Sequence, residues 1–353
     1  MTDKIALGRS FKRGTGLYAG KYRWTEGRIA WTRNLSLLFP IALAISLVSP
    51  GLVWSQDSSS AQKSLGGDYM LRVNANLVIL SATVLDHDNA LVSGLNKDDF
   101  QVYEDRVLQQ IKDFSHEDLP VTVGLVIDNS GSMGSKRADV IAAALSFARS
   151  SNPRDQIFVV NFNEHVSYGL PAGIPFTDRR DQLQLALSSI RTIGETALYD
   201  AISTALDHLK QGSCEKKVLI LISDGGDNAS KHTLAEVIEM AKKSSAILYT
   251  IGIFDEQDLD QNPGVLKRFA KETGGQAFFP GSSKEIPSIC EKIARDIRNQ
   301  YTLAYVPTIS KRDDGYRVLD VRASAPGHGR LSVRTRTGYS LSLAPAIREG
   351  NLP

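Results

Sequence analysis

The sequence predicts an α/β protein whose main domain is built on a mostly parallel sheet. Apolar runs of strand length alternate with amphipathic helical segments across residues 119–299, which is typical of strand–helix–strand units. Residues 70–118 and 300–342 instead contain short stretches of alternating polarity without helical segments between them, a pattern that indicates β-strands. We therefore expect an α/β domain with a β segment on either side of it.

The expected elements of the α/β region follow from the period of their apolar residues. Strands are predicted at residues 121–128, 156–162, 166–170, 217–223, 246–253 and 276–279. Helices are predicted at residues 136–150, 181–190, 197–210, 234–244, 265–273 and 283–299. The strands are apolar on both faces, and such strands are covered by helices on both sides of a parallel sheet.

The composition excludes some classes of function. The chain has 353 residues and a net charge of +2, so nothing in the charge balance indicates nucleic-acid binding. Cys214 and Cys290 are its only cysteines and lie far apart in the sequence. A disulfide framework is excluded by this count, whereas a single disulfide bond stays open.

The N-terminal region has the pattern of an export signal. Residues 1–34 are polar and basic, and residues 35–54 carry no charge. We interpret residues 35–55 as a cleaved signal peptide or an uncleaved membrane anchor, and residues 56–69 as a linker. Either interpretation exports the rest of the chain, to the periplasm or the outer face of the inner membrane, with membrane contact only through an uncleaved anchor.

Polar side chains follow two of the predicted strands where each strand ends. Asp128 ends the first strand and is followed by Ser130 and Ser132; Asp224 follows the strand at 217–223, and Thr196 precedes a helix. Parallel strands place their carboxyl ends at one edge of a sheet, where ligands bind. Oxygen donors of this kind suit a hard cation such as Mg²⁺. A capped turn explains the first segment alone, but the joint arrangement favours a metal site.

Three of these segments resemble the motifs of a known domain family. DNSGS at 128–132, GETALYD at 194–200 and SDGGDN at 223–228 are similar, in order and spacing, to the motifs of the von Willebrand factor A-type domain. The resemblance covers residues 119–299 and implies a doubly wound sheet with a metal-ion-dependent adhesion site. It implies that Ser130 and Ser132 bind Mg²⁺, Mn²⁺ or another divalent cation directly and Thr196 directly or through water, while Asp128 and Asp224 act largely through water.

The flanking segments resemble one subfamily. LNKDDFQVYED at 95–105 and YTLAYVP at 301–307 are similar to exported bacterial "VWFA-related" proteins described from Acidobacteria. Neither flank is large enough to bury an apolar face alone. We therefore expect residues 70–118 and 300–342 to pair into one small β-sandwich, with the domain at 119–299 inserted and residues 343–353 as a tail.

Several further side chains have a predicted place. Asp227 and Glu195 lie close enough to the motifs to support the metal ligands, although a loop-capping role is favoured for Asp227. Arg334 and Arg336 share one face of a strand, and a solvated face is expected there. The remaining expectation concerns scattered histidines that should lie at the surface: His165, His208, His232 and His328.

The resemblance implies a partner protein that offers an Asp or Glu carboxylate to the metal. The favoured hypothesis is thus an exported protein-binding module that is not an enzyme. Two alternatives stay open: a scaffold of the cell envelope in which the metal is purely structural, and a metal-assisted hydrolase. The hydrolase is the weaker of the two, because no His or Glu in the sequence clearly fills the role of a base beside the metal.

Overall fold

The computed structural model describes residues 77–188, 191–254, 260–308 and 315–340. The predicted basic region at 1–34, the signal or anchor at 35–55, the linker at 56–69 and the tail at 343–353 lie outside these residues. Within the described ranges, no helix is long and apolar enough to cross a membrane. All described elements fall within one unit, residues 71–353.

A six-stranded sheet forms the centre of the α/β domain, in the order β10-β9-β8-β5-β6-β7. Its strands are β5 (Val121–Asp128), β6 (Gln156–Phe162), β7 (Val166–Tyr168), β8 (Lys216–Ser223), β9 (Ile247–Gly252) and β10 (Ala277–Phe278). All neighbours are parallel except β7, which runs antiparallel to β6 at the edge. Every residue of β5 is buried, as expected for a central strand covered on both faces.

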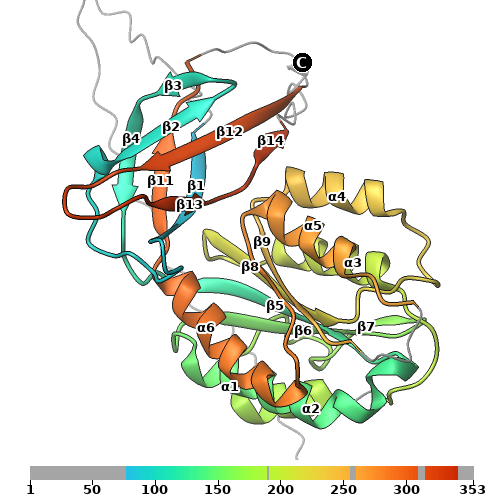
Figure 1. The fold of residues 1–353 in the computed structure, drawn as a ribbon. Helices are drawn as coiled ribbons and strands as arrows, with labels where there is room; N and C mark the ends of the chain where they lie inside the picture. The colour runs from blue at the N-terminus through green and yellow to red at the C-terminus, as the bar shows by residue number, and fades with distance from the viewer. Residues whose placement is uncertain (1–76, 189–190, 255–259, 309–314, 341–353) are drawn as a thin grey trace, which may run out of the picture. The chain divides into compact units, whose positions relative to one another are not determined.

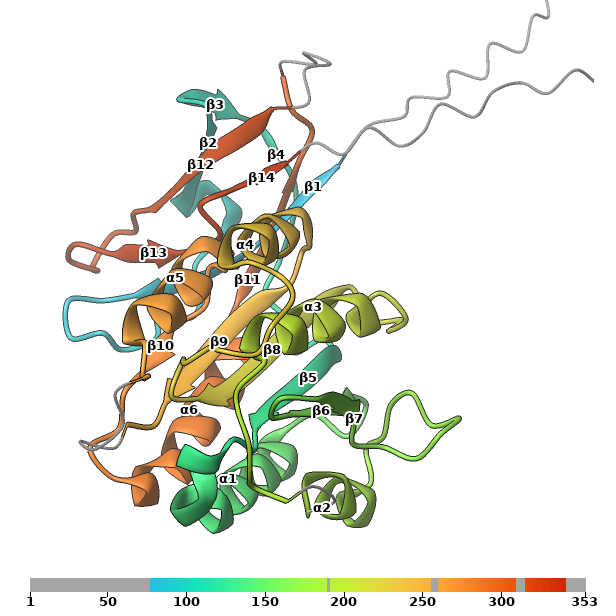
Figure 2. The same ribbon diagram turned by 90° about the vertical axis from the view of Figure 1, so that its right-hand side faces the viewer.

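Helices cover both faces of this sheet (Figures 1 and 2). They are α1 (Arg137–Ser150), α2 (Arg180–Ser188), α3 (Leu198–Leu209), α4 (Leu234–Lys243), α5 (Pro263–Thr273) and α6 (Ile286–Arg298). The first, second and sixth lie on one face, and the third, fourth and fifth on the other (Figure 2). A capping box of Thr233 and Glu236 begins α4, and Gly274, with φ of 82°, ends α5.

The two flanks pair into a β-sandwich of two four-stranded sheets, with orders β13-β1-β11-β4 and β14-β12-β2-β3. The N-terminal flank supplies β1 (Val78–Leu85), β2 (Phe100–Glu104), β3 (Val107–Gln109) and β4 (Ile111–Ser115). The C-terminal flank supplies β11 (Tyr301–Tyr305), β12 (Tyr316–Ala323), β13 (Ser332–Arg334) and β14 (Gly338–Ser340). Each sheet thus contains strands from both flanks, and the predicted fold class is confirmed.

A buried carboxylate lies in the core of the sandwich. Glu104 on β2 accepts hydrogen bonds from the hydroxyls of Tyr305 on β11 and Tyr339 on β14, at 2.6 and 2.8 Å. Tyr305 belongs to the other sheet, so this bond joins the two layers. Burial, followed by the bond to Glu104, raises the pKa of both phenols well above the ordinary value. The two tyrosines therefore act as hydrogen-bond donors at any physiological pH.

A second polar cluster joins the sandwich to the α/β domain. Asp296 on α6 accepts hydrogen bonds from the Thr83 hydroxyl at 3.0 Å and the Tyr249 hydroxyl at 2.9 Å, and it pairs with Arg334. Arg336 donates to the main-chain carbonyls of Lys242 and Gly338. The expectation of a solvated face for the two arginines is therefore wrong. Arg334 ends β13 and Arg336 lies just after it, and their side chains contact α6 and α4 instead of water.

Two other side-chain predictions are corrected or decided by the structure. His208 is buried, not at the surface, because its ring packs against Phe158 and Phe176 while Nε2 lies 2.8 Å from the Pro175 carbonyl. Cys214 and Cys290 are both free thiols. Cys290 is buried in α6, and burial raises its pKa to about 12, so it behaves as an inert apolar side chain.

Candidate metal centre

The structure brings four of the five predicted site residues into one hydrogen-bonded group. Asp128 is the last residue of β5, Ser130 and Ser132 lie in the turn that follows, and Asp224 comes directly after β8. The hydroxyls of Ser130 and Ser132 are 3.1 Å apart, and Ser132 Oγ donates to Asp224 Oδ2 at 2.5 Å. Asp128 Oδ1 accepts from the main-chain N–H of Ser130 at 2.8 Å. The parallel pairing of β5 with β8 is what places these groups side by side.

The fifth residue, Thr196, is held at the same edge through its main chain. Its loop is bonded to the Asp128 turn, because the N–H of Gly131 donates to the Gly194 carbonyl at 3.1 Å. On the other side, Thr196 N–H donates to Asn228 Oδ1 at 2.8 Å, and its carbonyl accepts from Asn228 N–H at 3.0 Å. Thr196 is therefore a buried residue held between the segment after β5 and the segment after β8.

The electrostatics of the site favour a cation. Asp128 is almost fully buried, and burial followed by the nearby carboxylate of Asp224 raises its pKa to about 6. Hydrogen bonds from Ser130 and Ser223 oppose this shift. Two buried carboxylates with hydroxyl neighbours repel each other, and a divalent cation between them would remove that repulsion.

The side-chain atoms at the site also suit a cation. All five side chains offer oxygen, which hard cations prefer. No cluster of three His, Cys, Asp or Glu side chains suited to a metal occurs among the described residues, so a cation at this edge would depend on hydroxyls. The residues present fit Mg²⁺ or a similar divalent cation.

The two supporting residues named from the sequence differ in their surroundings. Asp227 Oδ1 accepts from the Tyr199 N–H at 3.1 Å and from the Ser230 hydroxyl at 2.6 Å. It therefore caps the start of α3, in agreement with the loop-capping role. Glu195 is exposed beside the site, so it lies where an approaching partner would meet it.

Sequence reasoning missed two residues that fix the site. Ser223 donates its hydroxyl to Asp128 Oδ2 at 2.6 Å. Buried Asn129 donates to the Ile127 carbonyl at 2.9 Å and accepts from Arg137, which also donates to Thr192 at 3.0 Å. In the sequence, only their position could have indicated this role, because both residues are polar and stand next to predicted ligands.

Comparison with known proteins identifies the central domain. A model of the von Willebrand factor type A domain matches residues 123–226, a range that includes all five predicted ligands. The chain therefore contains a von Willebrand factor type A domain, as the motifs predicted. The finer assignment to the exported bacterial subfamily stays a prediction.

Individual relatives are distant. An uncharacterized protein of Borreliella burgdorferi is 26% identical over 194 residues, which cover 52% of this chain and 53% of that protein. The chain thus spans about half the length of this curated relative.

Solved structures with likeness to the chain include two bacterial proteins. An aerotolerance-related membrane protein from Bacteroides fragilis is 17% identical, with a TM-score of 0.41, over 50% of this chain and 98% of that one. A von Willebrand factor type A protein from Catenulispora acidiphila is 14% identical, with a TM-score of 0.47, over 75% of each chain. The domain assignment rests on the family match and the strand order, not on these likenesses.

Proposed function

We propose that this protein is an exported, metal-dependent protein-binding module. Asp128, Ser130, Ser132, Thr196 and Asp224 would hold a divalent cation, and an Asp or Glu carboxylate of a partner protein would complete its coordination. The observation that carries the proposal is the group formed by Ser130, Ser132 and Asp224. Ser132 Oγ lies 3.1 Å from Ser130 Oγ and 2.5 Å from Asp224 Oδ2. Von Willebrand factor type A domains generally mediate protein–protein interaction, which supports the same function.

The ligand types determine what such a cation would do. Hydroxyl oxygens are neutral, so a cation held mainly by Ser130, Ser132 and Thr196 would keep most of its charge and attract an external carboxylate. The protein's own part is to position these groups: the Ser132 hydroxyl lies between the Ser130 hydroxyl and the Asp224 carboxylate, and two hydrogen bonds hold the carboxylate of Asp128. The exposed side chains at this edge, such as Glu195 and Ile193, would then contact the partner and select it.

Export is part of the proposal and rests on the N-terminal sequence pattern. The basic residues at 1–34 followed by the uncharged stretch at 35–54 would direct the α/β domain out of the cytoplasm. A periplasmic or membrane-anchored location would bring the candidate metal site to partners in the cell envelope.

Binding of Mg²⁺ is the first test. Isothermal titration calorimetry of the wild type with Mg²⁺ is expected to show one site, and Ser130→Ala is expected to abolish it. Ser135→Ala is the matched control, because Ser135 is an exposed serine of the same turn and should bind like the wild type. Absence of Mg²⁺ and Mn²⁺ binding by the wild type would overturn the proposal.

Partner capture separates docking from the scaffold hypothesis. A pull-down from envelope extract uses the wild type and Asp128→Ala, each with magnesium or with a chelator. The proposal expects a partner retained only by the wild type with magnesium. A partner retained equally in all four conditions would contradict docking, and strong thermal stabilisation by magnesium without any metal-dependent partner would favour the scaffold.

A further inference from the structure

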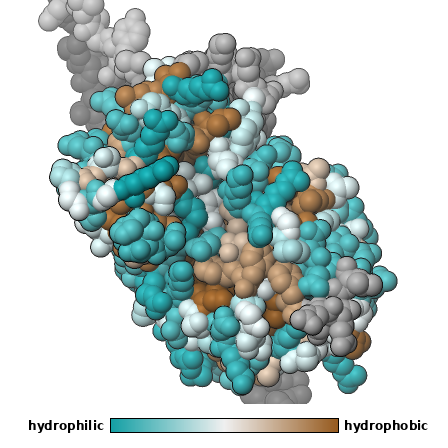
Figure 3. All heavy atoms as spheres, in the orientation of Figure 1, coloured by the Kyte–Doolittle hydropathy of each residue, from teal (hydrophilic) through white to brown (hydrophobic). Residues whose placement is uncertain are grey.

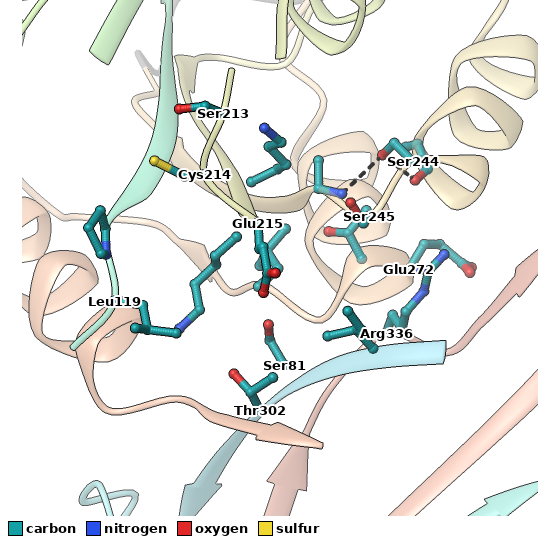
Figure 4. A pocket seen from close by; sticks show the side chains of 18 residues that line it. Ser81, Leu119, Ser213, Cys214, Glu215, Ser244, Ser245, Glu272, Thr302 and Arg336 are labelled. Atoms are coloured by element: carbon teal, nitrogen blue, oxygen red, sulfur yellow. Dashed lines mark hydrogen bonds between the residues drawn. The ribbon is translucent and has the colours of Figure 1, made fainter. Parts of the chain in front are cut away.

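A pocket of about 450 Å³ lies at the other end of the central sheet from the candidate metal centre. Figure 4 shows the side chains that line it. Ser81 and Thr302 on strands of the sandwich form one side of it, and Cys214 and Glu215 of the α/β domain form the other. Lys216 also lines the pocket. Lys216 begins β8 whereas Ser223 ends it, so the two sites are separated by about 23 Å at the usual rise per residue of a strand. The pocket is therefore distinct from the metal centre.

Apolar side chains are left uncovered in this pocket. Ile79 on β1 is 46% exposed and Leu119 is 39% exposed, although both are large and apolar. They line the pocket together with Ile247, the first residue of β9. A volume in this range, at the junction of two structural layers and with largely apolar walls, is characteristic of small-molecule sites.

The hydrogen bonds that the three cations of the pocket donate all go to main-chain carbonyls. Lys216 Nζ donates to the Ile297 carbonyl at 3.1 Å, Lys217 Nζ donates to the Gly212 carbonyl at 2.5 Å, and Arg336 donates to the Lys242 and Gly338 carbonyls. Among the ion pairs of the described residues, none includes any of these three side chains.

The carboxylates of the pocket do not balance these charges. Glu272 already accepts from the Thr337 hydroxyl at 2.8 Å and lies 3.8 Å from Lys242. Glu215 is exposed, so its charge is screened by water. The pocket thus carries an excess of positive charge against apolar walls.

Lys216 is the cation best placed to meet a ligand. Burial lowers its pKa to about 8, and the charges of Asp118, Asp296 and Asp155 oppose this shift from beyond ion-pair distance. The ammonium therefore stays mostly charged at neutral pH while largely removed from water, an arrangement that an anionic ligand would stabilise. Arg336 is less available, because two main-chain carbonyls already occupy its guanidinium.

We propose that this pocket binds a small amphipathic monocarboxylate, with its carboxylate at Lys216 and its hydrocarbon body against Ile79, Leu119 and Ile247. A nucleotide or another polyanion fits less well, because the walls are largely apolar and the guanidinium fork of Arg336 is occupied. The proposal is independent of the candidate metal centre, and it adds a second ligand class to the protein.

Octanoate is the probe for the test, with 1-octanol as its uncharged analogue of the same chain length. Calorimetry on the full chain is expected to show one octanoate site, with 1-octanol bound about tenfold more weakly or worse, because the charge-assisted bond is missing. Lys216→Met is expected to weaken octanoate about tenfold and to leave 1-octanol unchanged. The control Lys243→Met removes an exposed charge from α4 and should bind octanoate like the wild type.

A second variant tests the location without touching the charge. Ser245→Trp places a large ring at the exposed pocket wall and is expected to abolish octanoate binding with an unchanged circular dichroism spectrum. A chelator should leave octanoate binding unaffected, so failure here and failure of the metal proposal are distinguishable. Equal octanoate affinity in the wild type and Lys216→Met, equal affinity for octanoate and 1-octanol, or no binding by the wild type would overturn the inference.

Discussion

The hydroxyl of Ser223 donates a hydrogen bond to Oδ2 of Asp128 at 2.6 Å, so the last residue of β8 fixes the last residue of β5. The other carboxylate oxygen of Asp128 is held by the N–H of Ser130. One oxygen is thus oriented by a residue of β8 and the other by a residue of the turn after β5. The carboxylate cannot rotate freely, and the candidate site is already arranged before any ligand arrives.

The first prediction concerns this bond. Ser223→Ala is expected to weaken Mg²⁺ affinity about tenfold, because a residue that orients a metal-site carboxylate typically contributes that much. Titration calorimetry measures the loss, and Ser135→Ala again provides the control. An affinity equal to the wild type would show that Ser130 alone orients Asp128.

The second prediction concerns the loop that carries Thr196. Gly194 has φ of 86°, and a Cβ there would also lie 1.6 Å from Glu164 Oε2. Gly194→Ala is expected to destabilise the fold by about 1 kcal/mol from the backbone conformation and to weaken Mg²⁺ binding, because the loop must shift.

Gly173→Ala is the matched control for that variant. Gly173 has the same φ of 86° but open space around it, so the alanine there should cost similar stability without any effect on Mg²⁺. Urea unfolding and calorimetry measure the two effects separately. An equal loss of Mg²⁺ affinity in both variants would contradict the role assigned to the loop.

The third prediction concerns the junction between the sandwich and the α/β domain. Asp296→Asn is expected to lower the free energy of unfolding by about 3 kcal/mol, because it removes the buried carboxylate that pairs with the partly buried guanidinium of Arg334. Urea unfolding followed by circular dichroism measures this change. Asp113→Asn, on an exposed position of β4, should change stability little.

A double variant checks the cause. Asp296→Leu combined with Arg334→Met removes both charges, so it should be more stable than Asp296→Asn. A double variant that is less stable than the single one would show that packing, not the unpaired charge, determines the loss.

The fourth prediction concerns the pH dependence of stability. The folded-state pKa of Lys216 is about 8, below its ordinary value of 10.5, so the folded chain holds this proton less tightly than the unfolded chain. The cost in folding free energy of burying the Lys216 charge is therefore at its full value below pH 8. It disappears as the pH rises toward 10.5. Lys216→Met should be more stable than the wild type at pH 7 by about 2 kcal/mol.

The difference in free energy of unfolding between Lys216→Met and the wild type should shrink between pH 8 and 10.5. Unfolding in urea at pH 7, 9 and 10.5 measures it, and taking the difference cancels the titration of other lysines and tyrosines. A gap that is independent of pH, or a variant less stable than the wild type at pH 7, would contradict the prediction.

Most of the fold could be predicted because its elements are locally consistent. The strand at Val121–Asp128 was predicted to the residue, since an apolar run bounded by a polar turn leaves little choice. The pairing of the two flanks was predictable by elimination, because neither can bury its apolar face alone. Four of the five candidate ligands likewise lie at or just after strand ends that the sequence marks clearly, and Thr196 precedes a predicted helix.

The features that the sequence did not reveal depend on contacts between distant segments. Ser223 reaches Asp128 only through the register that pairs Ile127 with Ile222. His208 is buried by rings from β6 and the loop after β7. The pocket at Lys216 exists only where the sandwich meets the α/β domain, so no single stretch of sequence encodes it.

The shared sandwich also determines when the chain can finish folding. Strands β1 and β2 are made first, but their partners β11 and β12 follow the whole α/β domain in the sequence. A chain that stops before residue 300 would leave β1 and β2 with unpaired edges, which favour aggregation. The α/β domain can form during synthesis, whereas the sandwich closes only on a finished polypeptide. Its closure thus distinguishes complete chains from truncated ones.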